Sequence, residues 1–355
     1  MKRKSKIVIA ILSVLVFVVV SLFCGVYFVF LHRYEGSEWD RPFDPSAPFD
    51  LSKVKTVEKR EGEPFVILNL ADVQLCDLED FFHFNVIKEE ILSLVDEVRP
   101  DLITLTGDQT WSNENLMSLK RLVRLLDSLR IPYAPVFGNH DGGNDIDSAV
   151  LSRNACADVY EGAKYCLFDR GPSDVGGIGN YVVNVVERDR IVKTLYFLDG
   201  GSEDTLTDRQ TEWLIWNADG IKAANGGEYA DGMCFMHKPL PEYREAYRAY
   251  LRGEAEAEGD VHVHYSLSGV EQTGFFEAAT SRGVTDYVCG HQHGNNFSIN
   301  YRGARLTFAV KTGELGGAYR EEGFALNGAT YFVIEDGKTT VHHRYVDANA
   351  FRIDE

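Results

Sequence analysis

The chain has 355 residues, and its 54 Asp and Glu residues outnumber its 36 Lys and Arg residues, giving a formal net charge of −18 at pH 7. This excess of negative charge disfavours large polyanionic partners, so we expect no binding to nucleic acid or to anionic lipid headgroups. Six cysteines are too few for a disulfide-stapled scaffold. Cys156 and Cys166 could close a short loop in an oxidising compartment, but free thiols are the preferred interpretation.

The N-terminus predicts a membrane anchor. Residues 1–6 contain four cations and no acid, and residues 7–31 contain neither a charge nor a proline. At a rise of about 1.5 Å per residue, a helix over 7–31 is long enough to cross a hydrocarbon core of about 30 Å. The basic flank predicts a cytoplasmic tail over 1–6, so that the chain after Leu31 lies outside the cell membrane. A cleaved signal peptide is the alternative, but the apolar run exceeds the usual signal core of about 7–15 residues.

Residues 32–62 are polar and irregular, with Pro42, Pro45 and Pro48, which predicts an extended tether. Residues 63–348 are then long enough for one large α/β domain, followed by a short C-terminal tail over 349–355.

Short apolar runs within this domain predict strands, which we expect at Phe65–Leu70, Leu102–Thr106 and Tyr133–Phe137. Apolar residues at helical spacing lie between them, as expected for a βαβαβ unit with a parallel sheet. Further strands are expected at Tyr181–Val186, Thr194–Leu198, Met233–Met236, Asp286–Cys289, Arg305–Val310, Thr330–Ile334 and Thr339–Tyr345. The last two flank Asp336-Gly337, a turn that predicts a hairpin. This order fits two sheets packed face to face with helices outside.

Polar motifs begin where several of these strands end. They are Asp72-Val73-Gln74, Gly107-Asp108, Gly138-Asn139-His140-Asp141, His237 and Gly290-His291-Gln292-His293. Each motif alone has an ordinary explanation, because aspartates cap turns and a His-x-His pair is often a surface feature. Ligands of open α/β sheets gather at the carboxyl ends of strands, so the five motifs can converge. Together they supply the carboxylate, amide and imidazole donors of a two-metal hydrolytic site.

This set of motifs resembles the calcineurin-like metallophosphoesterase superfamily, whose pattern is Asp-x-His, Gly-Asp, Gly-Asn-His-Asp/Glu, a lone His and Gly-His-x-His. Segments such as His237–Tyr243 and Gly290–Phe297 are similar to the purple-acid-phosphatase-like branch of fungi and plants. The resemblance covers residues 63–345, and it implies an α/β fold, a four-layer α/β/β/α sandwich of two mixed sheets, here preceded by the one transmembrane helix.

The resemblance also implies a role for each motif. Asp108 would bridge two metal ions, divalent or mixed-valence Mn, Fe or Zn. The first ion would be held by Asp72, His293 and residue 74, and the second by Asn139, His237 and His291. His140 would lie over the phosphate of a mono- or diester, stabilising charge or protonating the leaving oxygen, while a metal-bridging hydroxide attacks. Asn295 is a candidate substrate contact.

Two residues depart from the family pattern. Residue 74 is Gln where the pattern usually has His; an amide oxygen donates more weakly than imidazole, so the first site could favour Mn, Mg or Ca, or Gln74 could turn away. Trp111 occupies the position at which true purple acid phosphatases carry a ferric-binding Tyr, so we do not expect a purple enzyme.

Two other functions are compatible with a metal-ligand set. Another metallohydrolase class, such as an amidohydrolase, would carry its His-x-His early in the chain, whereas here it comes late. A metal-binding ectodomain with reduced or no catalysis would have lost several ligands, whereas only Gln74 departs.

Overall fold

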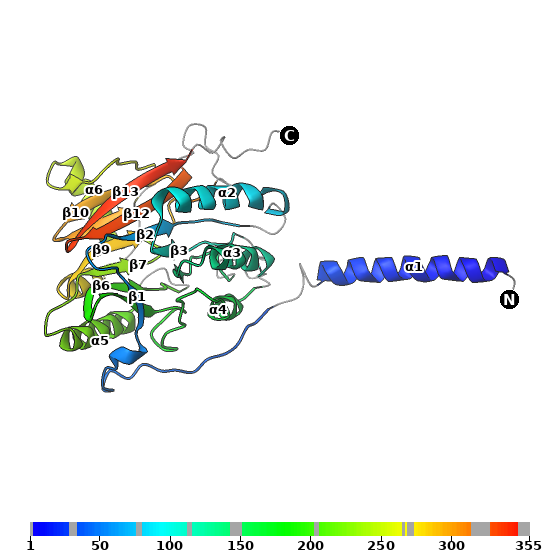
Figure 1. Cartoon of the computed structure of the whole chain (residues 1–355), viewed down its shortest axis with the longest axis horizontal. Coiled ribbons are helices and arrows are strands. Elements are labelled where there is room, and N and C mark those ends of the chain that lie inside the picture. The colour runs from blue at the N-terminus through cyan, green and yellow to red at the C-terminus, as the bar shows by residue number, and fades with distance from the viewer. Residues whose placement is uncertain are drawn as a thin grey trace.

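Two β-sheets form the centre of the domain, and one long helix precedes it (Figure 1). The computed structural model describes residues 3–27, 34–75, 80–111, 116–142, 151–201, 206–264, 267, 273–313 and 327–346. The helices of the described chain are α1 (Arg3–Val26), a short 3-10 helix η2 (Leu51–Lys53), α2 (Asp80–Val98), α3 (Leu116–Leu129), α4 (Arg153–Glu161), α5 (Asp208–Ala224), α6 (Pro241–Leu251) and α7 (Phe275–Thr280).

Helix α1 extends away from the domain (Figure 1). Its stretch Ser5–Val26 is long and apolar enough to cross a membrane, and none of it is buried against the rest of the protein. A signal sequence would share these properties. The last residues of the expected span, 28–31, lie outside the described residues.

Each sheet mixes parallel and antiparallel pairs. The smaller sheet has the order β13 (Lys338–Val346), β12 (Asn327–Glu335), β2 (Phe65–Leu70), β3 (Leu102–Thr106) and β4 (Tyr133–Val136). The larger sheet has the order β1 (Lys55–Glu58), β5 (Tyr181–Glu187), β6 (Arg190–Phe197), β7 (Gly232–Phe235), β9 (Val284–Cys289), β11 (Ala304–Phe308), β10 (Phe297–Tyr301) and β8 (Glu256–Ala257).

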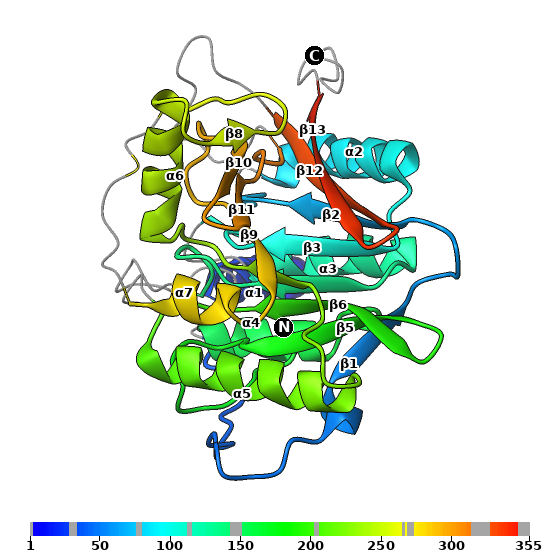
Figure 2. The ribbon, with the colours of Figure 1, turned by 90° about the vertical axis from the view of Figure 1, so that its left-hand side faces the viewer.

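The alternation of side chains along β6 shows how the layers pack. Leu195 and Phe197 belong to the core shared with the smaller sheet and with helices α2 and α3. Tyr196, between them, belongs to the second core, beneath α5, α6 and α7. Successive side chains of a strand point to opposite faces. The larger sheet therefore lies between the smaller sheet and the outer helices, in the expected α/β/β/α order (Figure 2).

The topology confirms the predicted βαβαβ unit and the C-terminal hairpin. Strands β2, β3 and β4 pair in parallel, as expected for segments joined by crossover helices. Strands β12 and β13 pair antiparallel from Glu335 and Lys338 outward. Asp336 and Gly337 have φ values of 50° and 72°, which suit a tight hairpin turn.

Three strands were not expected from the sequence. β1 lies inside the segment 32–62 expected to be a tether, β8 lies in the acidic stretch that follows α6, and β10 follows the His-x-His motif. β1 pairs in parallel with β5 and buries Val57. This part of the segment is therefore an edge strand of the domain, because a sheet edge supplies hydrogen-bond partners that the segment lacks on its own.

The segment before β1 also lies on the domain. The indole Nε1 of Trp39 donates to Gly171 O at 3.0 Å, and the rings of Phe43 and Phe49 pack edge-on against Trp216 of α5. These aromatic contacts stabilise the packing of the segment against the domain.

The described cysteines are free thiols, including Cys156 and Cys166, as preferred from the sequence. Cys76 lies outside the described residues.

Candidate metal centre

The five polar motifs lie at the carboxyl ends of strands from both sheets. Asp72, Asp108 and Asn139 follow β2, β3 and β4, while His237 and His291 follow β7 and β9. Because β2–β4 are parallel to one another and β7 is parallel to β9, their carboxyl ends meet in two adjacent rows. This topology brings together side chains that are far apart in the sequence.

The backbone of these loops is held in a conformation that side chains rarely adopt. Asp72, Gln74, Asp108 and His291 have φ values of 53°, 53°, 51° and 74°. Left-handed backbone at non-glycine residues costs about 1–3 kcal/mol each and is concentrated at functional sites. The tight turns direct the side chains back over the ends of the strands.

Two glycines allow the loops to approach one another. A Cβ atom added to Gly138 would lie 2.1 Å from Asp108 Oδ1, and one added to Gly290 would lie 2.4 Å from Asp72 Oδ2. Both distances are far below van der Waals contact. These positions must therefore be glycine, because the carboxylates of Asp108 and Asp72 lie so close to the backbone that no side chain would fit.

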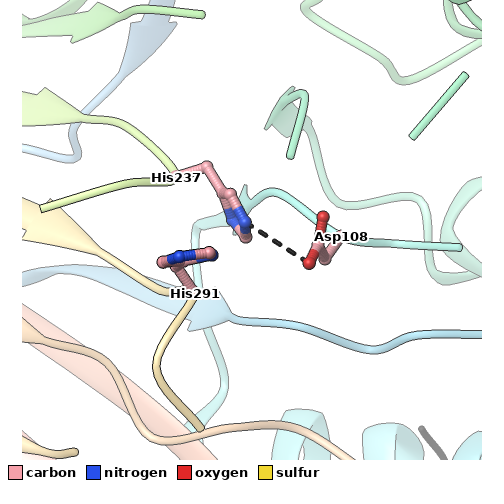
Figure 3. Close-up of side chains that lie close together, drawn as sticks. All are labelled: Asp108, His237 and His291. Atoms are coloured by element: carbon pink, nitrogen blue, oxygen red, sulfur yellow. Dashed lines mark ion pairs between the residues drawn. The ribbon is translucent and has the colours of Figure 1, made fainter. Parts of the chain in front are cut away.

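The described His, Asp, Glu and Cys side chains form two groups whose ligand atoms all lie within 4.8 Å of one another. One group is Asp72, Asp108 and His293, and the other is Asp108, His237 and His291. Figure 3 shows the second group, with the side chains of three separate loops directed toward one another. Asp108 belongs to both groups, which is the position required of a carboxylate that bridges two ions.

Hydrogen bonds fix the orientation of His237. Its Nδ1 lies 2.9 Å from Thr106 O, and its Nε2 lies 2.9 Å from Asn139 Oδ1 and 3.3 Å from Asp108 Oδ2. These oxygens can only accept, so Nδ1 donates to Thr106 O, and Nε2, the atom directed into the site, donates to Asn139 Oδ1. An ion bound there would replace the proton on Nε2. Asn139 Oδ1 and Nε2 of His237 thus lie side by side, as two ligands of one ion would.

The charges of the site shift the pKa values of its members in opposite directions. Burial alone would lower the pKa of His237, but the carboxylates of Asp108 and Asp72 outweigh it and raise that pKa to about 9. Burial alone would raise the pKa of Asp108, but His237 holds it well below its usual range. Burial, reinforced by His237, lowers the pKa of His291 to about 4. With a pKa this low, the His291 imidazole is neutral at neutral pH. The neutral imidazole is the form that binds metal.

Gln74 supplies a test of whether a metal fits. Its backbone N donates to Asp108 O at 2.8 Å, but Nε2 and Oε1 of its side chain are buried with no hydrogen-bond partner among the described residues. Leaving a buried polar group unsatisfied costs about 1–3 kcal/mol. A metal ion bound by the amide oxygen would relieve this cost, so the oxygen and imidazole donors of this site fit the group that the motifs imply.

His140 and Asn295, the other candidates from the sequence, lie beside these groups in different ways. The backbone N of His140 donates to Asp108 Oδ1 at 2.8 Å, and its Nε2 lies 3.9 Å from Asp108 Oδ2. Asn295 uses its side chain within the neighbouring loops, since Oδ1 accepts from His264 N at 2.8 Å and Nδ2 donates to Gln292 Oε1. Contact of Asn295 with substrate stays a prediction, as do the individual ligand roles.

Sequence reasoning assigned no role to Asp141 or Lys311. The buried Asp141 carboxylate accepts from the backbone N of Thr110 at 3.0 Å and of Gly138 at 2.9 Å, joining two of the loops. Nζ of Lys311 donates to Asp72 O at 2.8 Å and to Gly313 O at 2.9 Å, and burial lowers the pKa of Lys311 to about 8. Lys311 follows the end of β11, so the rule that located the other motifs could have found it.

The fold and the donor set define a metallophosphoesterase type of site. A family model described as calcineurin-like phosphoesterase matches residues 65–295. This is well over half of the chain, and the chain belongs to that family. The prediction made from the motifs is confirmed, and membership implies divalent metal ions as cofactors.

Two curated relatives and one solved structure illustrate the similarity. Phosphatase DCR2 of Saccharomyces cerevisiae is 26% identical over 298 residues, covering 72% of this chain and 48% of the relative. The "Probable inactive purple acid phosphatase 28" of Arabidopsis thaliana is 25% identical over 235 residues, covering 59% and 57%. A dimetal phosphatase from Danio rerio is 13% identical with a TM-score of 0.48, covering 80% and 97%. The chain thus spans about half the length of the curated relatives it matches.

Proposed function

We propose that the protein is a membrane-anchored, dinuclear metal-dependent phosphoesterase that hydrolyses phosphate mono- or diesters outside the cell. The observation that carries this proposal is the sharing of Asp108 between two ligand groups, Asp72–Asp108–His293 and Asp108–His237–His291. In this proposal the first ion is held by Asp72, Asp108, His293 and Gln74, and the second by Asp108, Asn139, His237 and His291.

The bound ions would supply Lewis acidity toward the phosphate and a lowered pKa for a water molecule. The residues of the chain would hold the ions in place and shield them from bulk solvent. Asp72 and Asp108 are nearly inaccessible to solvent, and a dry carboxylate pair binds cations more strongly than an exposed one. Mn, Fe or Zn are the proposed ions, since imidazole and carboxylate donors together suit these metals.

His140 would act on the leaving oxygen. It has about 21% of its side chain exposed and lies next to Asp108 without belonging to either ligand group. An imidazole at the open side of such a site can donate a proton or stabilise negative charge on the phosphate.

The proposed location follows from the apolar α1 and from the four cations in residues 1–6. The tail would remain in the cytoplasm and the domain would face the exterior. Phosphatase DCR2, a curated relative, is named for phosphatase activity, which supports a phosphate ester as the substrate.

The second candidate is a metal-binding ectodomain with reduced or no catalysis. Two observations favour it: Gln74 stands where the family usually has His, and one relative is named as an inactive phosphatase.

One experiment separates the two functions. Detergent-solubilised full-length protein is stripped of metal, its metal content is measured, and hydrolysis of 4-nitrophenyl phosphate and of bis(4-nitrophenyl) phosphate is followed before and after addition of Mn²⁺. We expect activity only with metal. Tight metal binding without hydrolysis of either ester would support the binding ectodomain, and full activity after verified metal removal would refute the two-metal proposal.

A further inference from the structure

The indole of Trp111 lies against the imidazole of His140. The ring centroids are 4.3 Å apart and the ring planes are inclined by 33°. The Nε2 atom of His140 is 3.9 Å from Asp108 Oδ2, which is too long for a hydrogen bond. Within the described part of the chain, no hydrogen bond to the His140 imidazole is formed. The face of the indole is therefore the close contact that can set the orientation of this ring.

The backbones that carry the two rings are joined. Trp111 N donates to Leu75 O at 2.8 Å, so the residue is tied to the loop of the first motif. Thr110, its neighbour, donates through N and Oγ1 to Asp141 Oδ1, both at 3.0 Å. Asp141 is the residue after His140. The buried carboxylate of Asp141 thus binds Thr110, the residue before Trp111. These hydrogen bonds fix the backbone next to each of the two stacked rings.

We propose that Trp111 is a positioning residue, whose indole holds the His140 imidazole over the substrate phosphate. This inference rests on the proposed function, in which His140 acts on the leaving oxygen. A flat aromatic face restricts rotation of an imidazole while leaving both ring nitrogens available for proton transfer. A hydrogen-bond acceptor in its place would occupy one of these nitrogens.

The kinetic test uses three substitutions at one position. Trp111→Ala should lower kcat by roughly 10- to 100-fold, because small displacements of a reacting group cost rates of this size, while KM stays nearly unchanged. Trp111→Phe should retain most of the activity because it keeps an aromatic face. Trp111→Leu, the apolar control without one, should resemble Trp111→Ala. Raised KM with unchanged kcat, or equal activity of the Leu and Phe variants, would overturn the proposal. Metal content and circular dichroism of each variant verify that the site is intact.

A double-mutant cycle gives a readout that a merely structural role would not produce. If Trp111 acts through His140, then Trp111→Ala should cause no further loss of kcat in a His140→Ala background. Losses that multiply would show that Trp111 acts independently of His140 and would overturn the proposal.

A fluorescence measurement separates this inference from the proposed function. The emission of Trp111 is obtained as the difference between the wild type and Trp111→Phe, both stripped of metal, since Trp39, Trp213 and Trp216 are common to the two. In the His140 background, the same difference is taken between His140→Ala and the double variant. A nearby imidazole quenches indole emission, so we expect the Trp111 contribution to rise without His140. An unchanged contribution would overturn the contact even if the enzyme is active. Absence of any hydrolysis by the wild type would refute the proposed function while leaving this result standing.

Discussion

Gln74 is the proposed metal ligand that departs from the family pattern, and the burial of its side chain makes this departure testable. Its carboxamide has no partner among the described residues. Gln74→His should tighten Zn²⁺ at one of the two sites, because imidazole donates more strongly than an amide oxygen to this metal. Calorimetric titration of the metal-free wild type, Gln74→His and Gln74→Ala compares stoichiometry and affinity. Equal affinities in all three proteins would mean that Gln74 is not a ligand.

His140 should affect the rate without affecting metal binding. His140→Ala is expected to lower kcat by about 10²- to 10⁴-fold, the range for a positioned acid or base. Metal content should equal that of the wild type, since His140 lies outside both ligand groups. Loss of metal from this variant, measured by elemental analysis, would show that the role assigned to His140 is wrong.

His343 should make the domain less stable in acid. It lies in β13, where its ring contacts Ser298 Oγ and Thr330 Oγ1 at 3.3 and 3.1 Å. Burial lowers its pKa from 6.5 to about 4; Asp260 opposes this shift, and His262 and His342 add to it. Between pH 6.5 and 4 the unfolded chain therefore binds more protons than the folded one, and the free energy of unfolding falls as the pH falls.

A pKa lowered from 6.5 to about 4 corresponds to about 3 kcal/mol over the whole window, and about 2 kcal/mol of this falls between pH 7 and pH 5. Urea unfolding of the wild type and of His343→Gln at pH 7 and pH 5 measures it. The variant should lose less stability on acidification. His342→Gln, at the exposed neighbouring position, is the control; it removes only the smallest contribution to the shift, so its loss of stability should stay close to that of the wild type.

At the scale of the elements, the site depends on how closely the strand-end loops approach one another. Gly138→Ala should abolish metal binding, because its Cβ would lie 2.1 Å from Asp108 Oδ1. Gly162→Ala at the end of α4 is the matched control, since its Cβ would lie 3.2 Å from Asp158 O and its φ of −78° suits alanine. Retention of both metal equivalents by Gly138→Ala would show that the loop can relax, contrary to this account.

At the scale of the whole molecule, the question is whether α1 remains on the mature protein. If α1 is an uncleaved anchor, the protein should fractionate with membranes, and protease added to intact cells should remove the domain. N-terminal sequencing should then begin at Met1 or Lys2. A soluble form starting near residues 25–35 would instead identify α1 as a signal sequence.

The amino-acid sequence predicted most of the elements and most of the residues that meet in the candidate site. Phe65–Leu70 and Leu102–Thr106 are strands at the expected bounds, because a short apolar run between turn residues is a local signal. The ligand motifs could be recognised in the sequence for a related reason, because each of them directly follows a short apolar run. β10 carried a usable signal as well, since Phe297, Ile299 and Tyr301 alternate with polar residues.

Only the tertiary structure decided which groups meet. β1 has no strong pattern of its own and becomes a strand because the edge of β5 supplies its hydrogen bonds. Lys311 reaches the Asp72 loop because β11 and β2, which precede these residues, belong to the two sheets that pack together. Trp111 lies on His140 because β3 and β4, which precede them, are neighbouring parallel strands of the smaller sheet. Periodicity and turn chemistry act over a few residues along the chain, whereas these contacts join residues that are remote in sequence. Their geometry follows from strand pairing within a sheet and from the packing of the two sheets, and it cannot be read from either segment alone.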